Sequence, residues 1–212
     1  MKRRAFLLGL ASLGAAAALP AAPAFAQALS GAQRTQALAR ASAALNAQRS
    51  LQGRFLQFAP DGSTSGGQFY LQRPGRVRFD YDGARGMLIV ADGSVVAMQD
   101  RALRTTNRAP LRSTPLYFVL KNDINLERDT RVTRVVREGD ALLVSTRDRS
   151  GRADGELTLR LHGPNYELRA WDVIDAAGAR TRIALSNVRQ AARIDPALFR
   201  APASSQQSIR GR

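Results

Sequence analysis

The chain has 212 residues and a formal net charge of +15, from 32 basic and 17 acidic residues, with one histidine and no cysteine. The absence of cysteine excludes disulfides, thiol chemistry and lipid attachment at a cysteine after a cleavage site. The positive charge fits an anionic lipid surface, an acidic partner or nucleic acid, or a compositional bias toward arginine, since Lys121 is the only lysine after residue 26.

Residues 1–26 have the three parts of a cleavable export signal: residues 2–4 are basic, residues 6–19 are apolar, and Ala24-Phe25-Ala26 is a small-x-small cleavage site. Arg3-Arg4 fits either a general secretory or a twin-arginine signal. Removal of these residues leaves about 186 and lowers the charge from +15 to +12, because three basic and no acidic residues are lost. No later apolar run approaches about 18 residues, so we expect a soluble periplasmic protein that does not bind nucleic acid.

Residues 30–49 are predicted to form an amphipathic helix. Leu38, Ala41 and Leu45 recur at helical spacing, with polar side chains between them. Ser30 is expected to cap the start of this helix.

From Leu51 onward the hydrophobic period changes to two, which predicts strands. The clearest case is 76–82, where Val77, Phe79 and Tyr81 alternate with arginines and aspartates. Short turns such as Asp61-Gly62 separate the segments and predict an antiparallel meander that must curl or close to protect its edges. The other expected strands are 51–58, 66–73, 87–91, 94–99, 101–106, 131–138, 140–147, 155–161, 166–175 and 180–189.

A short apolar helix is predicted to interrupt these strands. Ser113-Thr114-Pro115 is typical of a helix start. The segment Leu116-Tyr117-Phe118-Val119-Leu120 is apolar on every side and ends at 121–123. Such a helix is either a buried connection or a cover over an apolar surface. Residues 200–212 are rich in Ala, Ser, Gln and Arg, and we expect a flexible tail there.

Residues typical of catalysis or metal binding are scarce. His162 is the sole histidine, beside a Gly-Pro-Asn turn, and no Gly-x-Ser-x-Gly motif accompanies it. Asp80 and Asp82 are spaced for solvation on a strand as well as for ligation, and no calcium-loop pattern surrounds them. We therefore expect no enzymatic activity, no metal and no cofactor.

Several segments, in their order and spacing, resemble the LolA-type lipoprotein carriers, and together they span nearly the whole mature chain. The resembling segments are Gly53-Arg54-Phe55-Leu56-Gln57, the run from Gly66 to Phe79 with its Arg73-Pro74 corner, Asp92-Gly93 after an Ile-Val pair, Thr114 to Asn122, Ile183 to Asn187, and Ile194 to Phe199.

The resemblance implies a fold and a function. The fold would be an open antiparallel β-barrel of about eleven strands over residues 27–199, with an N-terminal helix and a helical lid. The function would be to receive triacylated lipoproteins from an inner-membrane ABC-type release complex. The carrier, expected to be a monomer, would deliver them to an outer-membrane acceptor lipoprotein or to the outer membrane itself.

The resemblance also implies site residues. Arg73 would hold the lid closed when the cavity is empty. The lid would comprise Leu116, Tyr117, Phe118 and Leu120. Alternation of side chains then predicts an acyl-chain cavity lined by Phe55, Phe69, Leu71, Val77, Phe79, Tyr81, Leu88, Val90, Val96 and Met98.

Two alternatives remain open at this point. The fold could carry or sense another lipid, or the chain could be a basic periplasmic protein that binds polyanions, with steep salt dependence. A carrier of acyl chains has the clearest physical purpose, since each exposed methylene costs roughly 0.8 kcal/mol in water.

Overall fold

The structure is a computed structural model that describes residues 26–114, 116–151 and 153–203, without the side chain of Leu116. The expected export signal, apart from Ala26, and the expected tail beyond residue 203 lie outside the described residues. No helix in the described ranges is long and apolar enough to cross a membrane.

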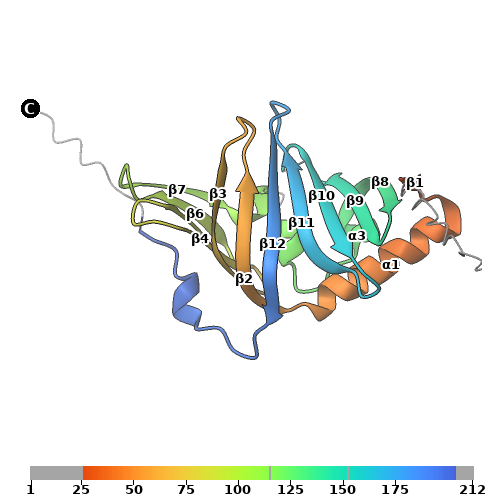
Figure 1. The fold of residues 1–212 in the computed structure, drawn as a ribbon, viewed down its shortest axis with the longest axis horizontal. Helices are drawn as coiled ribbons and strands as arrows, with labels where there is room; N and C mark the ends of the chain where they lie inside the picture. The colour runs from red at the N-terminus through yellow and green to blue at the C-terminus, as the bar shows by residue number, and fades with distance from the viewer. Residues whose placement is uncertain (1–25, 115, 152, 204–212) are drawn as a thin grey trace, which may run out of the picture.

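One antiparallel sheet of twelve strands dominates the described part of the chain (Figure 1), in the order β1-β8-β9-β10-β11-β12-β2-β3-β4-β5-β6-β7. The strands are β1 (Gln27–Ala28), β2 (Ser50–Phe58), β3 (Thr64–Gln72), β4 (Arg76–Tyr81), β5 (Met87–Asp92), β6 (Val95–Asp100), β7 (Thr105–Pro110), β8 (Thr130–Glu138), β9 (Ala141–Asp148), β10 (Glu156–His162), β11 (Glu167–Ile174) and β12 (Arg180–Gln190). The helices are α1 (Gly31–Ala47), α2 (Leu116–Leu120) and α3 (Leu126–Asp129), with 3-10 turns η1 (Leu111–Ser113) and η2 (Pro196–Phe199).

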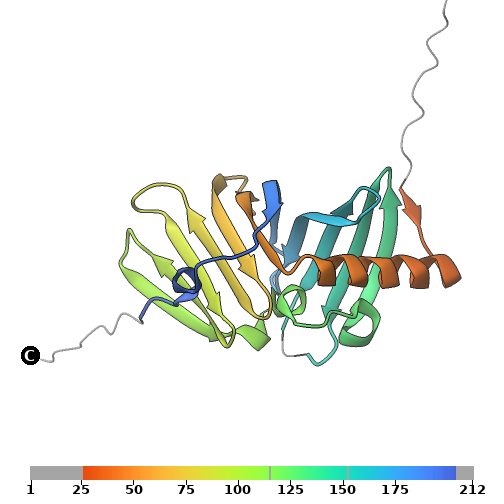
Figure 2. The same ribbon diagram turned by 90° about the horizontal axis from the view of Figure 1, so that it is seen from below.

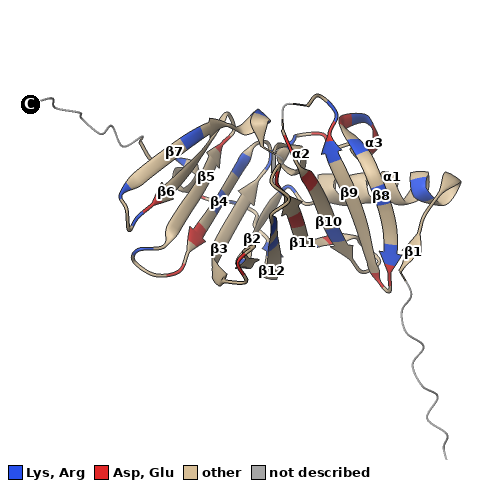
Figure 3. Ribbon diagram, turned by 90° about the horizontal axis from the view of Figure 1, so that it is seen from above, with Lys and Arg blue, Asp and Glu red and all other residues tan. Residues whose placement is uncertain are grey.

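The sheet consists of two halves joined where the last strand, β12, pairs with β2. Strands β2–β7 form one half, and β1 with β8–β12 forms the other. Seen from below and from above, the halves curve away from this junction, and α2 lies between them on the opposite side (Figures 2 and 3). The mainly β, open-sheet prediction is therefore confirmed.

The inner face of the curved sheet is apolar from one half to the other. Residues directly opposite one another on paired strands share a face, and the pairs Phe69↔Phe79 and Trp171↔Ile183 both belong to the main core. The apolar side chains of this inner face therefore need to be shielded from water by the helices, by the lid segment or by the opposite half of the sheet.

Helix α1 covers the inner face of the second half with the side chains that the periodicity predicted. Leu38, Ala41 and Leu45 are buried. Ser30 stands at the N-cap, as expected, but its side chain makes no capping hydrogen bond.

At the other end of α1, the side-chain amide of Asn46 bonds the backbone N–H and C=O of Ile124 at 2.9 Å each. These bonds fix the segment after α2 to the end of α1.

The strand expected at 101–106 lies further along the chain. Residues 101–104 form a turn, in which Asp100 Oδ1 accepts a hydrogen bond from the Leu103 N–H at 2.9 Å and Arg104 has φ +55°. Asp side chains stabilise such turns by bonding backbone groups shortly after them. The strand begins only at Thr105. The sequence patterns also missed two short elements, β1 and α3.

On the outer face, one buried carboxylate gathers three arginines. Asp172 is 2% exposed. Its oxygens accept from Arg182 Nε at 2.7 Å, Arg160 Nε at 3.0 Å and Arg180 Nη2 at 3.0 Å. Burial alone would raise the pKa of Asp172, but the hydrogen bonds from Arg182, Arg180 and Arg160 outweigh it and lower that pKa to about 2.

We predict that Asp172→Asn lowers the free energy of unfolding by about 2 kcal/mol, because it leaves three guanidinium groups together with only Glu138, 3.9 Å from Arg160, as a weak counter-charge. A group with a lowered folded-state pKa contributes stability above its unfolded pKa of about 3.9. The wild type should therefore lose this increment as the pH falls from about 4 toward 2, whereas the variant should not.

Urea unfolding followed by circular dichroism across this pH range measures both effects. Asp82→Asn is the matched control, because Asp82 pairs with Arg54 and both side chains are exposed. An exposed pair of this kind contributes less than about 1 kcal/mol. Equal losses in the two variants would contradict a special role for Asp172.

Candidate functional site

An apolar cavity of about 170 Å³ lies between the two halves of the sheet. Both halves supply its walls, and Thr114, which precedes α2, closes one side. The lining residues are Gln57, Phe79, Tyr81, Ile89, Thr114, Leu157, Trp171, Val173 and Ile183.

Aromatic rings form the floor of this cavity. Phe55 meets Phe79 edge-on with 5.1 Å between ring centroids, and Phe79 meets Trp171 from the other half at 5.9 Å. Phe55 and Tyr81 are separated by one strand, where Gly67 is the residue paired with both. Because Gly67 has no side chain, the two rings make contact over it at 4.8 Å. Edge-to-face pairs of this kind hold their geometry better than aliphatic contacts.

One polar pair interrupts the cavity wall. The Tyr81 hydroxyl donates to Gln57 Oε1 at 2.6 Å, and burial raises the pKa of Tyr81 to about 12. The hydroxyl is therefore neutral at physiological pH, and the cavity wall carries no charge. Such a surface suits an alkyl chain rather than an ion.

The structure places the ten predicted cavity residues unevenly. Phe79 and Tyr81 line the cavity, and Phe55 lies against both. Phe69, Leu71, Val77 and Val96 are buried in the same core. Met98 is opposite Ile89 on the inner face and is 45% exposed.

The expected inward direction of Leu88 and Val90 is wrong. Phe79 is paired with Ile89, so Ile89 points inward and its neighbours on β5 point outward. Both are nevertheless buried, because η2 lies against β4 and β5. Arg78, opposite Val90, donates to the Leu198 carbonyl at 3.2 Å on this outer side.

Only two of the nine lining residues, Phe79 and Tyr81, were predicted from the sequence as cavity residues. Four of the other seven are Leu157, Trp171, Val173 and Ile183. They belong to the last strands, whose alternation follows the same period of two as 76–82. Trp171, the single tryptophan, lies in a strand where apolar and polar residues alternate. This pattern was the sequence feature that could have identified it as a cavity residue.

The segment predicted to be a lid forms the short helix α2. Val119 and Leu120 are buried in the main core. Tyr117 and Phe118 are half-buried and meet edge-on at 5.9 Å. The side chain of Leu116 lies outside the described residues. The backbone carbonyl of Leu120 accepts from the Gly75 N–H at 2.7 Å, which joins the end of α2 to the turn between β3 and β4.

Arg73 bonds backbone carbonyls in two other segments, which are α2 and the residues just after α1. Its Nε donates to Val119 O in α2 at 2.8 Å, and its Nη1 donates to Gln48 O after α1. Its own N–H bonds Arg49 O at 2.8 Å. No partner for Nη2 lies in the described part of the chain. Burial, with a smaller contribution from the Arg49 charge, lowers the pKa of Arg73 to about 10. The guanidinium is therefore still a cation at neutral pH, desolvated and held by neutral oxygens.

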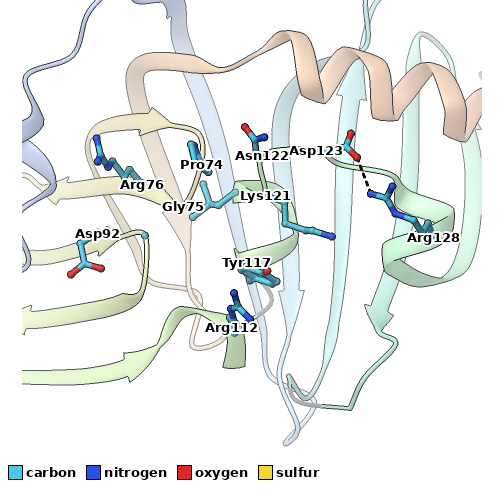
Figure 4. A pocket seen from close by; sticks show the side chains of 12 residues that line it. Pro74, Gly75, Arg76, Asp92, Arg112, Tyr117, Lys121, Asn122, Asp123 and Arg128 are labelled. Atoms are coloured by element: carbon cyan, nitrogen blue, oxygen red, sulfur yellow. Dashed lines mark hydrogen bonds and ion pairs between the residues drawn. The ribbon is translucent and has the colours of Figure 1, made fainter.

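A second pocket, of about 640 Å³, lies beside α2 and is lined by both charged and apolar side chains. Figure 4 shows its arginines together with Tyr117 and Lys121. Two of its cations are paired, Lys121 with Asp129 at 2.8 Å and Arg128 with Asp123 at 3.0 Å. The Arg112 guanidinium lies 5.8 Å from the Tyr117 ring centroid. This groove therefore borders α2 with charged side chains set among apolar ones such as Pro74 and Leu120.

Comparison with known proteins places the chain among lipoprotein carriers. A family model described as "Outer membrane lipoprotein carrier protein LolA" matches residues 46–202. An outer-membrane lipoprotein carrier protein of Leptothrix cholodnii is 31% identical over 156 residues, covering 69% of this chain and 72% of that protein. The corresponding protein of Methylococcus capsulatus is 31% identical over 165 residues, covering 73% and 78%. A solved LolA superfamily protein from Nitrosomonas europaea aligns over 78% of this chain and 96% of its own, with a TM-score of 0.46 and 12% identity.

We predict that Arg73→Leu increases amide hydrogen exchange in residues 117–120 by about 30-fold. Loss of two charge-assisted hydrogen bonds, partly offset by relief of a desolvated charge, should weaken closure by about 2 kcal/mol. Arg76→Leu is the matched control, because Arg76 is exposed and bonds only Gln72 among the described residues. Unchanged protection of α2 in Arg73→Leu would show that Arg73 does not hold the lid.

Proposed function

The chain belongs to the LolA family of outer membrane lipoprotein carriers, and we propose that it carries the acyl chains of lipoproteins across the periplasm, between the two halves of its sheet. The observation that carries this proposal is the uncharged, aromatic-floored cavity beneath a lid segment. Binding is non-covalent in this account and includes no catalytic step.

The volume of the cavity supports a cycle of opening and closing. Pockets that enclose small ligands usually measure about 300–1,000 Å³, whereas this cavity measures about 170 Å³. A long acyl chain therefore requires the lid or the two halves to move apart. We infer that the structure represents the closed state.

Energetics favour such a movable cover. Shielding one long acyl chain from water is worth about 10 kcal/mol or more. A carrier that gained all of that energy would not release its cargo. Closure of the lid returns apolar residues such as Val119 and Leu120 to the core, and this competing burial lowers the net affinity for an acyl chain.

Arg73 is the residue we propose as the gate. In the closed state it bonds Val119 O of α2 directly. An acyl chain that displaces α2 would break this bond and leave Arg73 closer to solvent, where its hydration improves. The desolvation of the guanidinium in the closed state thus limits how tightly the lid closes.

The family resemblance supports a proposal for the two ends of the cycle. We propose that an inner-membrane ABC-type complex supplies triacylated lipoprotein, and that an acceptor lipoprotein or the outer membrane itself receives it. The carrier would act in the periplasm as a monomer, after removal of residues 1–26.

The first test is native mass spectrometry of the mature protein mixed with a triacylated lipoprotein in detergent and then diluted. We predict a one-to-one complex with the wild type. Val173→Asp, which places a carboxylate in the cavity wall, should reduce the complex at least about tenfold. Ile174→Asp is the matched control, because this neighbour on β11 lies on the outer face and is equally half-buried.

Equal binding by both variants would place the acyl chains elsewhere. A wild-type protein that binds free lipid but no lipoprotein would instead support a carrier of another lipid.

The second test separates loading from delivery. Arg73→Leu should still form the complex in the same assay but should transfer the lipoprotein to outer-membrane vesicles several-fold more slowly, because closure no longer competes with the bound chain. Transfer at the wild-type rate, with Arg76→Leu measured alongside, would remove Arg73 from the mechanism.

A further inference from the structure

The outer face of the sheet carries a combined basic and apolar surface at the junction of its two halves. It comprises Arg160 of β10, Arg180 and Arg182 of β12, and Leu56 and Phe58 of β2. We call these five residues the outer patch. Arg182 is paired with Asp172 on one side and with Phe58 on the other, so the charged and apolar parts adjoin directly.

The basic part is held in place before any partner arrives. Asp172 uses both oxygens to fix the three guanidinium groups. Three cations around one carboxylate leave an excess charge of +2, which Glu138 reduces only weakly, since it lies 3.9 Å from Arg160. Each guanidinium has further N–H donors beyond those that bond Asp172. Fixed arginines lose less side-chain entropy when they bind a carboxylate.

The apolar part lies in the next two rows of the same face. Leu56 is 42% exposed and Phe58 is 39% exposed, and they are two of the four large hydrophobic residues exposed in the described ranges. Leu56 is flanked by the small residues Ala184 and Gly66 on the adjoining strands. The Leu56 side chain therefore projects beyond its two smaller neighbours and is open to solvent.

Other parts of this chain do not match the patch. The segment η2 lies against β4 and β5 rather than at the junction of β12 and β2. Residues 1–26 and 204–212 contain arginine or lysine but no aspartate or glutamate, so their charge has the same sign as the patch. A complementary occupant has to come from another molecule that carries carboxylates.

We propose that the outer patch docks a protein partner through a segment in which carboxylate and apolar side chains alternate. Arginine and aromatic residues are enriched at protein interfaces, and complementary charge speeds association. This surface lies on the opposite face of β11 and β12 from the cavity, so a partner bound there leaves the cavity and lid free. The inference does not depend on what the cavity carries.

The probe is a short synthetic peptide in which Glu alternates with Leu, titrated into the isotope-labelled mature protein and followed by NMR. We expect shifts confined to β10–β12, β2 and β3, and affinity that falls as salt is added. Phe58→Gln combined with Arg180→Gln should weaken binding at least about tenfold. Both side chains are exposed, so the fold should survive, which circular dichroism checks.

The matched control is Leu103→Gln combined with Arg108→Gln, which removes one exposed apolar residue and one exposed arginine near the far edge of the sheet. Wild-type affinity is expected for this variant. Equal weakening in both double variants, shifts outside β10–β12, β2 and β3, no binding, or equal binding of a peptide with Lys in place of Glu would each overturn the proposal. So would stronger binding of phosphatidylglycerol vesicles at the patch, which would identify it as a membrane contact instead.

Discussion

In the proposed mechanism, the closed state depends on a single guanidinium that is buried without a carboxylate partner among the described residues. Arg73 reaches the carbonyls after α1 and in α2, and neutral oxygens alone stabilise its charge among the described residues. Neutral acceptors compensate a desolvated cation less fully than an ion pair does. The contact is therefore directional enough to position α2 and weak enough to be lost when something else occupies the core. A carboxylate partner at the same place would hold the lid more firmly and oppose loading.

The arrangement of the sheet explains why the contact between Arg73 and α2 matters. Pairing of β12 with β2 joins two halves whose inner faces form one apolar surface. The two halves contact one another across the junction, where Phe79 meets Trp171. In the proposed cycle, movement of α2 would expose a wall whose aromatic rings already contact one another. The outer face has a different composition, with buried charge at Asp172 and exposed apolar side chains beside it.

The period-two pattern predicted most strands and the inner direction of Val77, Phe79 and Tyr81, because each is flanked by charged residues that need solvent. The same rule failed at Met87 to Val90, where four apolar residues follow one another. Burial on both faces removes the polar alternates that define direction, and here η2 covers the outer side. Trp171 and Ile183 line the cavity because strands that are distant in the sequence pair with one another. Local sequence patterns do not specify such pairing. The proposed gating role of Arg73 comes from the family resemblance, because no local pattern indicates that its side chain bonds Val119 O of α2.

The most direct test of the central claim is the distance between the lid and the sheet, with and without cargo. Because the chain has no cysteine, two introduced cysteines at the exposed positions Asn122 and Gln68 can carry spin labels without background. Double electron–electron resonance should give one narrow distance distribution for the empty protein, and a longer, broader one when a triacylated lipoprotein is bound. An unchanged distribution with cargo demonstrably bound would contradict a lid that opens on loading.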